Sequence, residues 1–310
     1  MSAYYEDVPS SFEDALRSAR RILSKNRELL RRGVVDAEAE LLVLAAYRKA
    51  SGKSLDRAGL YAHLRDRYPA PAAMFLLMMA GARAEGKPLQ HLTGWQVFLD
   101  HEYEVGPDVL IPRPETEGLV LAAWEEMTAL KEGPDLGLEI GIGSGVISVE
   151  LLTRFSGLRM IASEFSERAA VRAAANARRI LGDAGAGRLK IVMSADARTV
   201  FDAFRQDVPE GSADYVVMNP PYMSPTDEID ADVAAYEPRE ALFAPPDDVL
   251  YFYREAACNA RKFLRKSGML FAEIPHERAG DIEKLFLCEG WEAVLLKDLS
   301  GRDRVLKLRS

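Results

Sequence analysis

The stretch "LEIGIGSGVISVELL" (138–152) places three closely spaced glycines between two apolar segments. The first segment is short and apolar on both faces, as buried parallel strands are, and the second has helical character. Gly141, Gly143 and Gly145 let the backbone turn sharply and approach a ligand without Cβ clashes. Their spacing is not the dinucleotide fingerprint, and no Lys-Ser/Thr pair ends the loop. The stretch therefore predicts a strand, a glycine loop that does not bind pyrophosphate, and a helix.

Strand and helix patterns alternate from residue 136 to the C-terminus. The first five candidate strands are apolar on both faces, which predicts an open α/β sheet that binds ligands outside the carboxyl ends of its strands. No long helical segment separates the last two candidate strands, so we expect them to pair antiparallel at one edge. The candidate strands are residues 136–140, 159–163, 189–193, 214–219, 269–274, 292–297 and 304–308.

The chain before residue 112 has a different pattern. Residues 10–86 are all-helical in character, with Ser10 and Asp36 as expected helix caps. Residues 95–111 alternate apolar and polar positions, which predicts a β-hairpin or short strands joining two domains. We expect a helical domain over 1–90, a hairpin linker over 91–112 and an α/β domain over 113–310.

The composition of the 310 residues excludes several classes of protein. It is typical of a globular protein, with 48% hydrophobic and 28% charged residues, and it contains no apolar run that could span a bilayer. The net charge of −8 argues mildly against a nucleic-acid-binding protein. The two cysteines and four histidines are too few or too scattered for a disulfide framework or a zinc site. We expect a cytoplasmic protein with no metal and no membrane contact.

Two acidic residues follow the strands after the glycine loop. Glu164 follows the second candidate strand, where a carboxylate can accept hydrogen bonds from both ribose hydroxyls. Asp196 follows the third and could receive an adenine amine, with the backbone of Ala197 alongside. Together with the glycine loop, these residues predict a site for a nucleoside without phosphates. S-adenosylmethionine is the candidate cofactor.

The fourth candidate strand ends in "MNPPYM" (218–223). Asn219 offers a carbonyl acceptor, and the two prolines hold their own carbonyls rigidly. The Asn219 side-chain oxygen and the Pro220 carbonyl can each accept one N–H of a planar amine, which points the nitrogen lone pair at a methyl donor. Pro221 restricts Pro220 to an extended conformation, and Tyr222 can lay its ring on a flat substrate. These residues predict methylation of an amide or aromatic amine.

These motifs together resemble the HemK/PrmC family, the protein-(glutamine-N5) methyltransferases that act on peptide chain release factors. The likeness covers nearly the whole chain, but Glu139 and Glu164 stand where Asp is more usual in the family. The motifs that carry it, in the order of the family, are "RGVVDAEAELLVLAA" (32–46), "HLTGWQVFLDHEYEVGPDVLIPRPETEGLV" (91–120), "LEIGIGSG" (138–145), "NPPY" (219–222), "YEPREAL" (236–242) and "DLSGRDRV" (298–305).

The resemblance implies a Rossmann-like class I S-adenosylmethionine-dependent methyltransferase fold, with a seven-stranded mixed sheet and a small helical domain that recognises the substrate. It implies transfer of a methyl group to the glutamine of the Gly-Gly-Gln motif of a release factor, a protein of translation termination. We expect the enzyme to be a monomer. It implies glutamine contacts at Asn219, Pro220, Pro221 and Tyr222. The implied cofactor contacts are Gly141, Ile142, Gly143, Ser144, Gly145, Glu164, Ala197 and Asn219.

Three other functions are compatible with parts of the pattern. The same motifs serve glutamine methylation of a ribosomal protein, so the helical domain must discriminate between the two substrates. The NPPY motif also suits the exocyclic amine of adenine in nucleic acid, although the acidic composition argues against direct nucleic-acid binding. A binding protein with an inactive methyltransferase fold is a third alternative, but every expected site residue is present.

Overall fold

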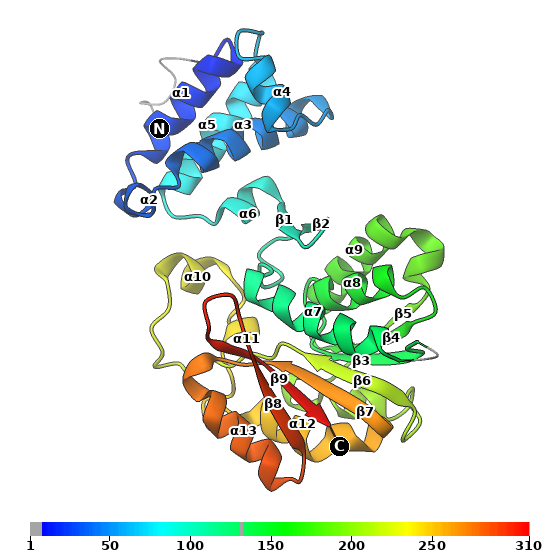
Figure 1. Ribbon diagram of the computed structural model, residues 1–310. Coiled ribbons are helices and arrows are strands. Elements are labelled where there is room, and N and C mark those ends of the chain that lie inside the picture. Colours follow the sequence, from blue (N-terminus) through cyan, green and yellow to red (C-terminus); the bar gives the residue numbers. More distant parts are fainter. Residues whose placement is uncertain (1–7, 131–132, 310) are drawn as a thin grey trace. The chain divides into compact units, whose positions relative to one another are not determined.

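The computed structural model of the chain describes residues 8–130 and 133–309 (Figure 1). These residues fall into two compact units. The first unit comprises Met1–Trp95 and the separate segment Asp230–Tyr236. The second comprises Gln96–Ile229 and Glu237–Ser310. No helix among the described residues is long and apolar enough to cross a membrane.

The first unit is helical, and α1, α3 and α5 pack against one another around its core. A buried ion pair links α3 to α5, because Arg83 Nε lies 2.6 Å from a carboxylate oxygen of Glu38. The helices of this unit are α1 (Phe12–Leu23), α2 (Arg27–Arg32), α3 (Val35–Ser51), α4 (Arg57–Ala62), α5 (Ala70–Ala84), α6 (Leu89–Thr93) and α10 (Ala231–Tyr236).

Both predictions of helix caps were wrong by one or two residues. Ser11, rather than Ser10, caps α1, and its hydroxyl accepts a 3.1 Å hydrogen bond from the backbone N–H of Asp14. The cap position of α3 is Val34, which makes no side-chain capping bond. Asp36 instead forms a 2.7 Å ion pair with Arg20, so its carboxylate serves a contact between helices.

The second unit contains a two-stranded hairpin and a seven-stranded mixed sheet of order β5-β4-β3-β6-β7-β9-β8, which confirms the expected α/β class. The strands from β5 to β7 are parallel, while β9 pairs antiparallel with both β7 and β8. The expected antiparallel pairing of the last two strands is therefore confirmed. The strands are β1 (Trp95–Phe98), β2 (His101–Glu104), β3 (Leu136–Ile140), β4 (Arg159–Glu164), β5 (Leu189–Met193), β6 (Ala213–Met218), β7 (Leu264–Glu273), β8 (Glu292–Lys297) and β9 (Asp303–Arg309).

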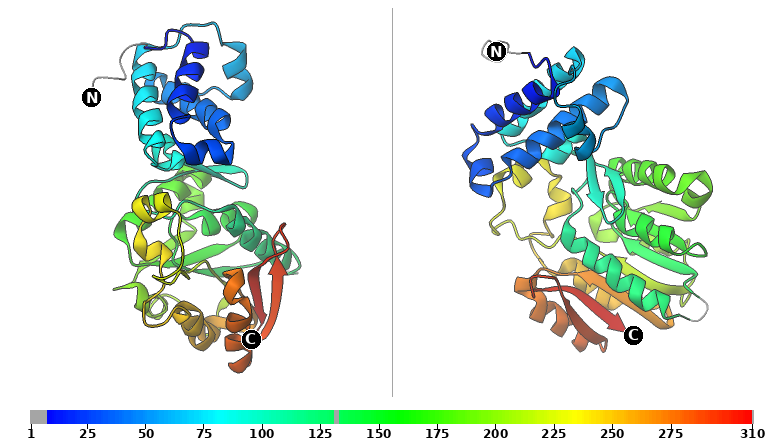
Figure 2. Two further views of the ribbon diagram at one scale, coloured as in Figure 1. Left: turned by 90° about the vertical axis from the view of Figure 1, so that its left-hand side faces the viewer. Right: turned by 45° about the horizontal axis from the view of Figure 1, so that its top comes forward.

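Helices cover both faces of the large sheet, with those coloured green on one side and those coloured orange on the other (Figures 1 and 2). Alternate residues of β6 supply the two cores: Tyr215 and Val217 pack on the side of α7 and α8, and Val216 and Met218 on the side of α12 and α13. The helices of this unit are α7 (Pro114–Thr128), α8 (Val146–Arg154), α9 (Glu167–Ala186), α11 (Arg239–Leu242), α12 (Tyr251–Phe263) and α13 (Ala279–Cys288), with short 3₁₀ turns η1 (Ala197–Thr199), η2 (Asp202–Phe204) and η3 (His276–Arg278).

Candidate active site

A pocket opens at the carboxyl ends of β3, β4 and β6. The chain runs outward from β3 to β5 on one side and then continues at β6 on the other, so the order of strands reverses between β3 and β6. Open α/β sheets bind ligands at such switch points. The space between its walls, counted together with the open solvent at its mouth, is about 970 Å³.

The glycine loop connects β3 to α8 on the floor of this pocket. Gly141 (φ +73°) and Gly143 (φ +54°) have left-handed backbones and line the pocket, and a Cβ on either would point into open space. Ile142 and Ser144 also line it. Gly145 (φ +86°) does not, and an added Cβ there would lie 3.2 Å from Ala173 of α9. Gly145 therefore lets the loop pack closely against α9.

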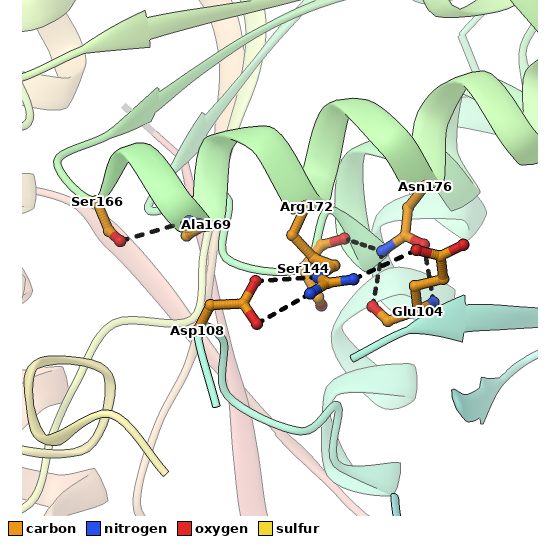
Figure 3. Close-up of polar contacts among 7 residues, drawn as sticks. All are labelled: Glu104, Asp108, Ser144, Ser166, Ala169, Arg172 and Asn176. Carbon is orange, nitrogen blue, oxygen red and sulfur yellow. Dashed lines mark hydrogen bonds and ion pairs between the residues drawn. The ribbon is translucent and has the colours of Figure 1, made fainter. Parts of the chain in front are cut away.

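Two side chains of α9 hold the end of β2 and the segment after it, and one of them, Asn176, also holds the glycine loop (Figure 3). Asn176 is fully buried, and its amide donates hydrogen bonds to the carbonyls of Ser144 (2.9 Å) and Glu104 (3.1 Å). Its carbonyl accepts a 2.8 Å bond from the Glu104 backbone N–H. One turn earlier, Arg172 forms a two-pronged ion pair with Asp108 at 2.9 and 3.1 Å. The shape of the glycine loop thus depends on a helix that follows it.

A buried carboxyl group supports the loop from below. Glu139 is 1% exposed, and its carboxyl accepts hydrogen bonds from the backbone N–H (3.0 Å) and the hydroxyl of Ser148 in the first turn of α8. Gly145 stands at the N-cap position of α8 but has no side chain, so the Glu139 carboxyl caps the first turn of the helix instead. Burial raises the pKa of Glu139 to about 8, helped by the negative charge of Glu164.

Glu164 ends β4 at the edge of the pocket and is buried. One of its oxygens accepts 2.9 Å hydrogen bonds from the backbone N–H groups of Phe165 and Ser166. The other accepts a 3.0 Å bond from the N–H of Gly143. A carboxylate offers about four acceptor sites, so three are in use and the carboxylate also braces the glycine loop.

The two residues expected near an adenine differ in position. Ala197 lines the pocket, whereas Asp196 is exposed and not part of the lining. Asp196 caps η1, and its carboxylate accepts a 2.7 Å hydrogen bond from the N–H of Arg198. The local turn thus already uses this side chain.

The NPPY segment follows β6 directly. Asn219, Pro220 and Pro221 line the pocket, and the Asn219 amide donates a 3.0 Å hydrogen bond to the hydroxyl of Thr116 in α7. No hydrogen bond to the Pro220 carbonyl occurs within the part of the chain that the structure describes. Tyr222 is not part of the lining. Its half-buried ring packs on the core beneath the sheet, and this burial raises the pKa of its hydroxyl to about 12.

The opposite wall brings together two segments that are distant in the sequence. Glu237 of "YEPREAL" is buried, and its carboxylate accepts hydrogen bonds from Arg113 (2.6 Å) and from the backbone N–H of Ile111 (3.0 Å). Arg113 lines the pocket, as do Pro238 and Glu240. The sequence pattern did not reveal this ion pair or the roles of Thr116 and Glu139 as supports, although Thr116 and Arg113 both lie within the quoted family motif.

Comparison with known proteins identifies relatives along most of the chain. It is 34% identical over 298 residues to release factor glutamine methyltransferase of Cereibacter sphaeroides, covering 95% of this chain and 99% of that protein. It is 34% identical over 231 residues to the Bacteroides thetaiotaomicron enzyme of the same name, covering 72% of this chain and 76% of that protein. The chain matches no family model.

Among solved structures, the release-factor-specific protein-(glutamine-N5) methyltransferase of Alicyclobacillus acidocaldarius is 26% identical and covers 67% of this chain and 99% of that one, with a TM-score of 0.40. The seven-stranded mixed sheet of this chain is the class I methyltransferase sheet that the resemblance implied. With an identity of 34% across 95% of its length, this chain belongs to the family of release factor glutamine methyltransferases.

Proposed function

We propose that this chain transfers a methyl group from S-adenosylmethionine to the side-chain nitrogen (N5) of the glutamine in the Gly-Gly-Gln motif of peptide chain release factors. One observation carries the proposal: Asn219 and Pro220 lie in the same pocket as the glycine loop, at the point where the strand order reverses. A methyl donor on the loop and an amide held by the NPPY segment would therefore be neighbours. Membership of the family supports the same activity.

The residues of the pocket fit a nucleoside cofactor. We assign its contacts to residues 141–145, Glu164, Ala197 and Asn219. Gly145 and Asp196 lie outside the lining, so we propose that Gly145 acts by shaping the loop and that the Asp196 carboxylate reaches the adenine only by leaving its bond to the N–H of Arg198. The open space above Gly141 and Gly143 supports a ligand resting on the loop. Glu164 has about one acceptor site left, so a bond to the second ribose hydroxyl requires the Gly143 N–H to change its partner.

When bound, the cofactor supplies a methyl group activated by a sulfonium. The chain supplies the acceptors that orient the substrate: the Asn219 side-chain oxygen and the Pro220 carbonyl each accept one N–H of the glutamine amide. Holding both N–H groups turns the nitrogen lone pair toward the methyl group, a positioning effect of several kcal/mol. The proton leaves after transfer, so no strong general base is required. Pro221 and Tyr222 support the two acceptors by holding the NPPY segment in place.

We further propose that the helical unit, our predicted domain 1–90, recognises the release factor. Met74 (57% exposed) and Met78 (70% exposed) lie one turn apart on α5 and form an apolar strip. Flexible methionine side chains suit a protein surface that must adapt to a partner. The proposal also includes a monomeric, cytoplasmic enzyme without metal that does not bind nucleic acid directly.

Mass spectrometry of a purified release factor after incubation with the enzyme and S-adenosylmethionine tests the activity. We expect the mass of the peptide that contains the Gly-Gly-Gln glutamine to increase by about 14 Da, because a methyl group replaces one hydrogen. Asn219→Ala should lower the rate by roughly 100-fold or more, as loss of one oriented polar group does. Asn259→Ala, which changes an asparagine of α12 outside the pocket, is the matched control. Methylation of a ribosomal protein or of nucleic acid in parallel incubations, with none on the release factor, would contradict the proposal.

A further inference from the structure

Residues 104–113 and the glycine loop both contribute to the pocket. Asp108, Val109 and Leu110 of the first segment line it, as do residues 141–144 of the loop. The helix α7 and the strand β3 separate the two segments in the sequence, so no local contact fixes the distance between them. The width of the pocket therefore depends on side chains that join the two segments.

Asn176 of α9 hydrogen-bonds to both segments (Figure 3). Its NH₂ group donates to the carbonyl of Ser144 in the loop at 2.9 Å and to the carbonyl of Glu104 at the end of β2 at 3.1 Å. Its own carbonyl accepts the backbone N–H of Glu104 at 2.8 Å. Both amide hydrogens and the amide oxygen are thus in use. Because the side chain is 0% exposed, water does not compete for these bonds.

These partners hold the Asn176 amide in one orientation. If the amide turned over, its oxygen would face the carbonyl oxygens of Ser144 and Glu104, and its NH₂ group would face the Glu104 N–H. Two acceptors or two donors cannot bond to each other, and buried polar groups without partners destabilise the fold. The amide therefore acts as a spacer of fixed length between the two segments.

Arg172, one turn earlier on α9, holds only the first of the two segments. Its guanidinium pairs with Asp108 at 2.9 Å and with Glu104 at 3.3 Å. The side chains of Arg172 and Asp108 are 28% and 14% exposed, so their contact is partly open to solvent. Arg172 and Asn176 thus both hold residues 104–113, but Asn176 also reaches the glycine loop.

We propose that Asn176 is a positioning residue that sets the gap between residues 104–113 and the glycine loop, and thereby the affinity of the pocket for S-adenosylmethionine. This inference rests on the proposed function, in which the cofactor binds on that loop. Asn176 lies outside the lining of the pocket, so it acts on the cofactor only through the backbone that it holds. The acceptors at Asn219 and Pro220 do not depend on this contact. We therefore expect an effect on cofactor binding and little effect on methyl transfer itself.

Three substitutions separate this role from a general effect on stability. Asn176→Asp keeps the size of the side chain and the acceptor for the Glu104 N–H, but it places a carboxylate oxygen against the carbonyls of Ser144 and Glu104. Arg172→Met loosens residues 104–113 and leaves the bond to the loop in place. Arg188→Met is the control, because Arg188 donates hydrogen bonds to three backbone carbonyls at the end of α8 and beyond it, away from the pocket lining.

Calorimetry with S-adenosylmethionine, urea unfolding and steady-state kinetics with release factor are measured for each variant. We expect the cofactor Kd to rise roughly tenfold or more in Asn176→Asp, where buried carbonyls lose their donors. In Arg172→Met it should rise by about threefold, as suits a partly exposed ion pair. Arg188→Met should lose stability but keep its Kd within about twofold of the wild type. In Asn176→Asp the KM for the cofactor should rise with the Kd, while kcat at saturating cofactor stays within about threefold of the wild type.

Hydrogen exchange of the cofactor-free protein gives a readout that needs no ligand. Peptides that cover residues 104–109 and 141–146 should exchange faster in Asn176→Asp than in the wild type, and at the wild-type rate in Arg188→Met. If Asn176→Asp does not fold, Arg172→Met provides the test: its Kd must rise while that of Arg188→Met does not.

Several results would overturn the inference. These are a wild-type Kd or wild-type exchange rates in folded Asn176→Asp, an equal rise of the Kd in Arg188→Met, or a lower kcat with an unchanged Kd. A wild type that binds S-adenosylmethionine but does not methylate release factor would refute the proposed function alone, because calorimetry and hydrogen exchange still test the role of Asn176.

Discussion

The carboxylate of Glu237 lies 2.6 Å from the guanidinium of Arg113 and joins the segment before α7 to the segment before α11. The Glu237 side chain is 1% exposed and that of Arg113 is 32% exposed, so the acid is buried while the base reaches solvent. Arg113 and Pro238, the neighbour of Glu237, both line the pocket. This pair therefore holds one wall of the site in place.

We expect Arg113→Met to damage the enzyme more than Glu237→Gln does. The first change leaves a buried carboxylate without its counter-ion, which costs up to ~3–5 kcal/mol for a fully buried pair and less for this half-open one. The second leaves no charge, and its amide oxygen can still accept the N–H of Ile111. Urea unfolding and the KM for release factor measure both effects. Arg159→Met, which breaks an exposed pair with Asp135, should change stability by less than ~1 kcal/mol. Equal stability of Arg113→Met and the wild type would refute this.

Gly145→Ala should lower stability and weaken cofactor binding. Alanine in a left-handed conformation costs ~1–2 kcal/mol, and here the added Cβ would also press on the backbone of Ala173 at 3.2 Å. Gly211→Ala is the matched control, since Gly211 has a similar left-handed backbone (φ +69°) with open space around it. Chemical denaturation should show a larger loss for Gly145→Ala than for Gly211→Ala, and calorimetry should show weaker cofactor binding in Gly145→Ala alone. Equal losses of stability in the two variants would contradict the prediction, because they would mean that the contact with Ala173 adds no cost.

The pH dependence of stability should change in Glu139→Gln. Burial raises the pKa of Glu139 from 4.5 to about 8 in the folded protein, so between these values the folded state holds a proton that the unfolded state has lost. The stabilisation is complete below pH 4.5 and is lost as the pH rises through 8. Glutamine does not titrate, so the free energy of unfolding of the variant relative to the wild type should rise from pH 5.5 to pH 8.5.

Urea titrations at several pH values check this slope. Glu292→Gln, at an exposed position at the start of β8, should follow the wild type at each pH. Glu273 also titrates high, because burial raises its pKa to about 7, and it contributes a slope of the same sign in both proteins. Parallel curves for Glu139→Gln and the wild type would contradict the prediction.

Much of the fold was predictable because its strands are apolar on both faces, as Leu138 and Val216 illustrate, and buried parallel strands have this pattern. The carboxyl ends of parallel strands meet at one edge, so the approach of Gly141, Glu164 and Asn219 to one pocket followed from their positions after three strands. Their roles in binding stay predictions.

The remaining features depend on tertiary contacts that no local pattern encodes. Thr116 and Asn219 are separated by 103 positions, and they meet because α7 packs on the face of the sheet that contains β6. The Tyr222 ring turns to the core because the apolar space lies there, although its sequence context fits the pocket equally well. Ser10 and Ser11 are equivalent as caps by residue type, so only the structure distinguishes them.

The apolar strip on α5 gives a test of substrate recognition that leaves the methyltransferase unit intact. Met78→Lys places a charge at a position that is 70% exposed, so the fold should tolerate it with little change in stability. If Met74 and Met78 contact the release factor, burying the lysine charge there should raise the KM for release factor roughly tenfold or more, while the cofactor Kd stays unchanged. Val171→Lys, at an equally exposed position on α9 of the other unit, is the matched control and should leave both constants unchanged. An unchanged KM in Met78→Lys would remove this strip from the proposed recognition surface, whereas a rise in both variants would point to a general effect of added positive charge.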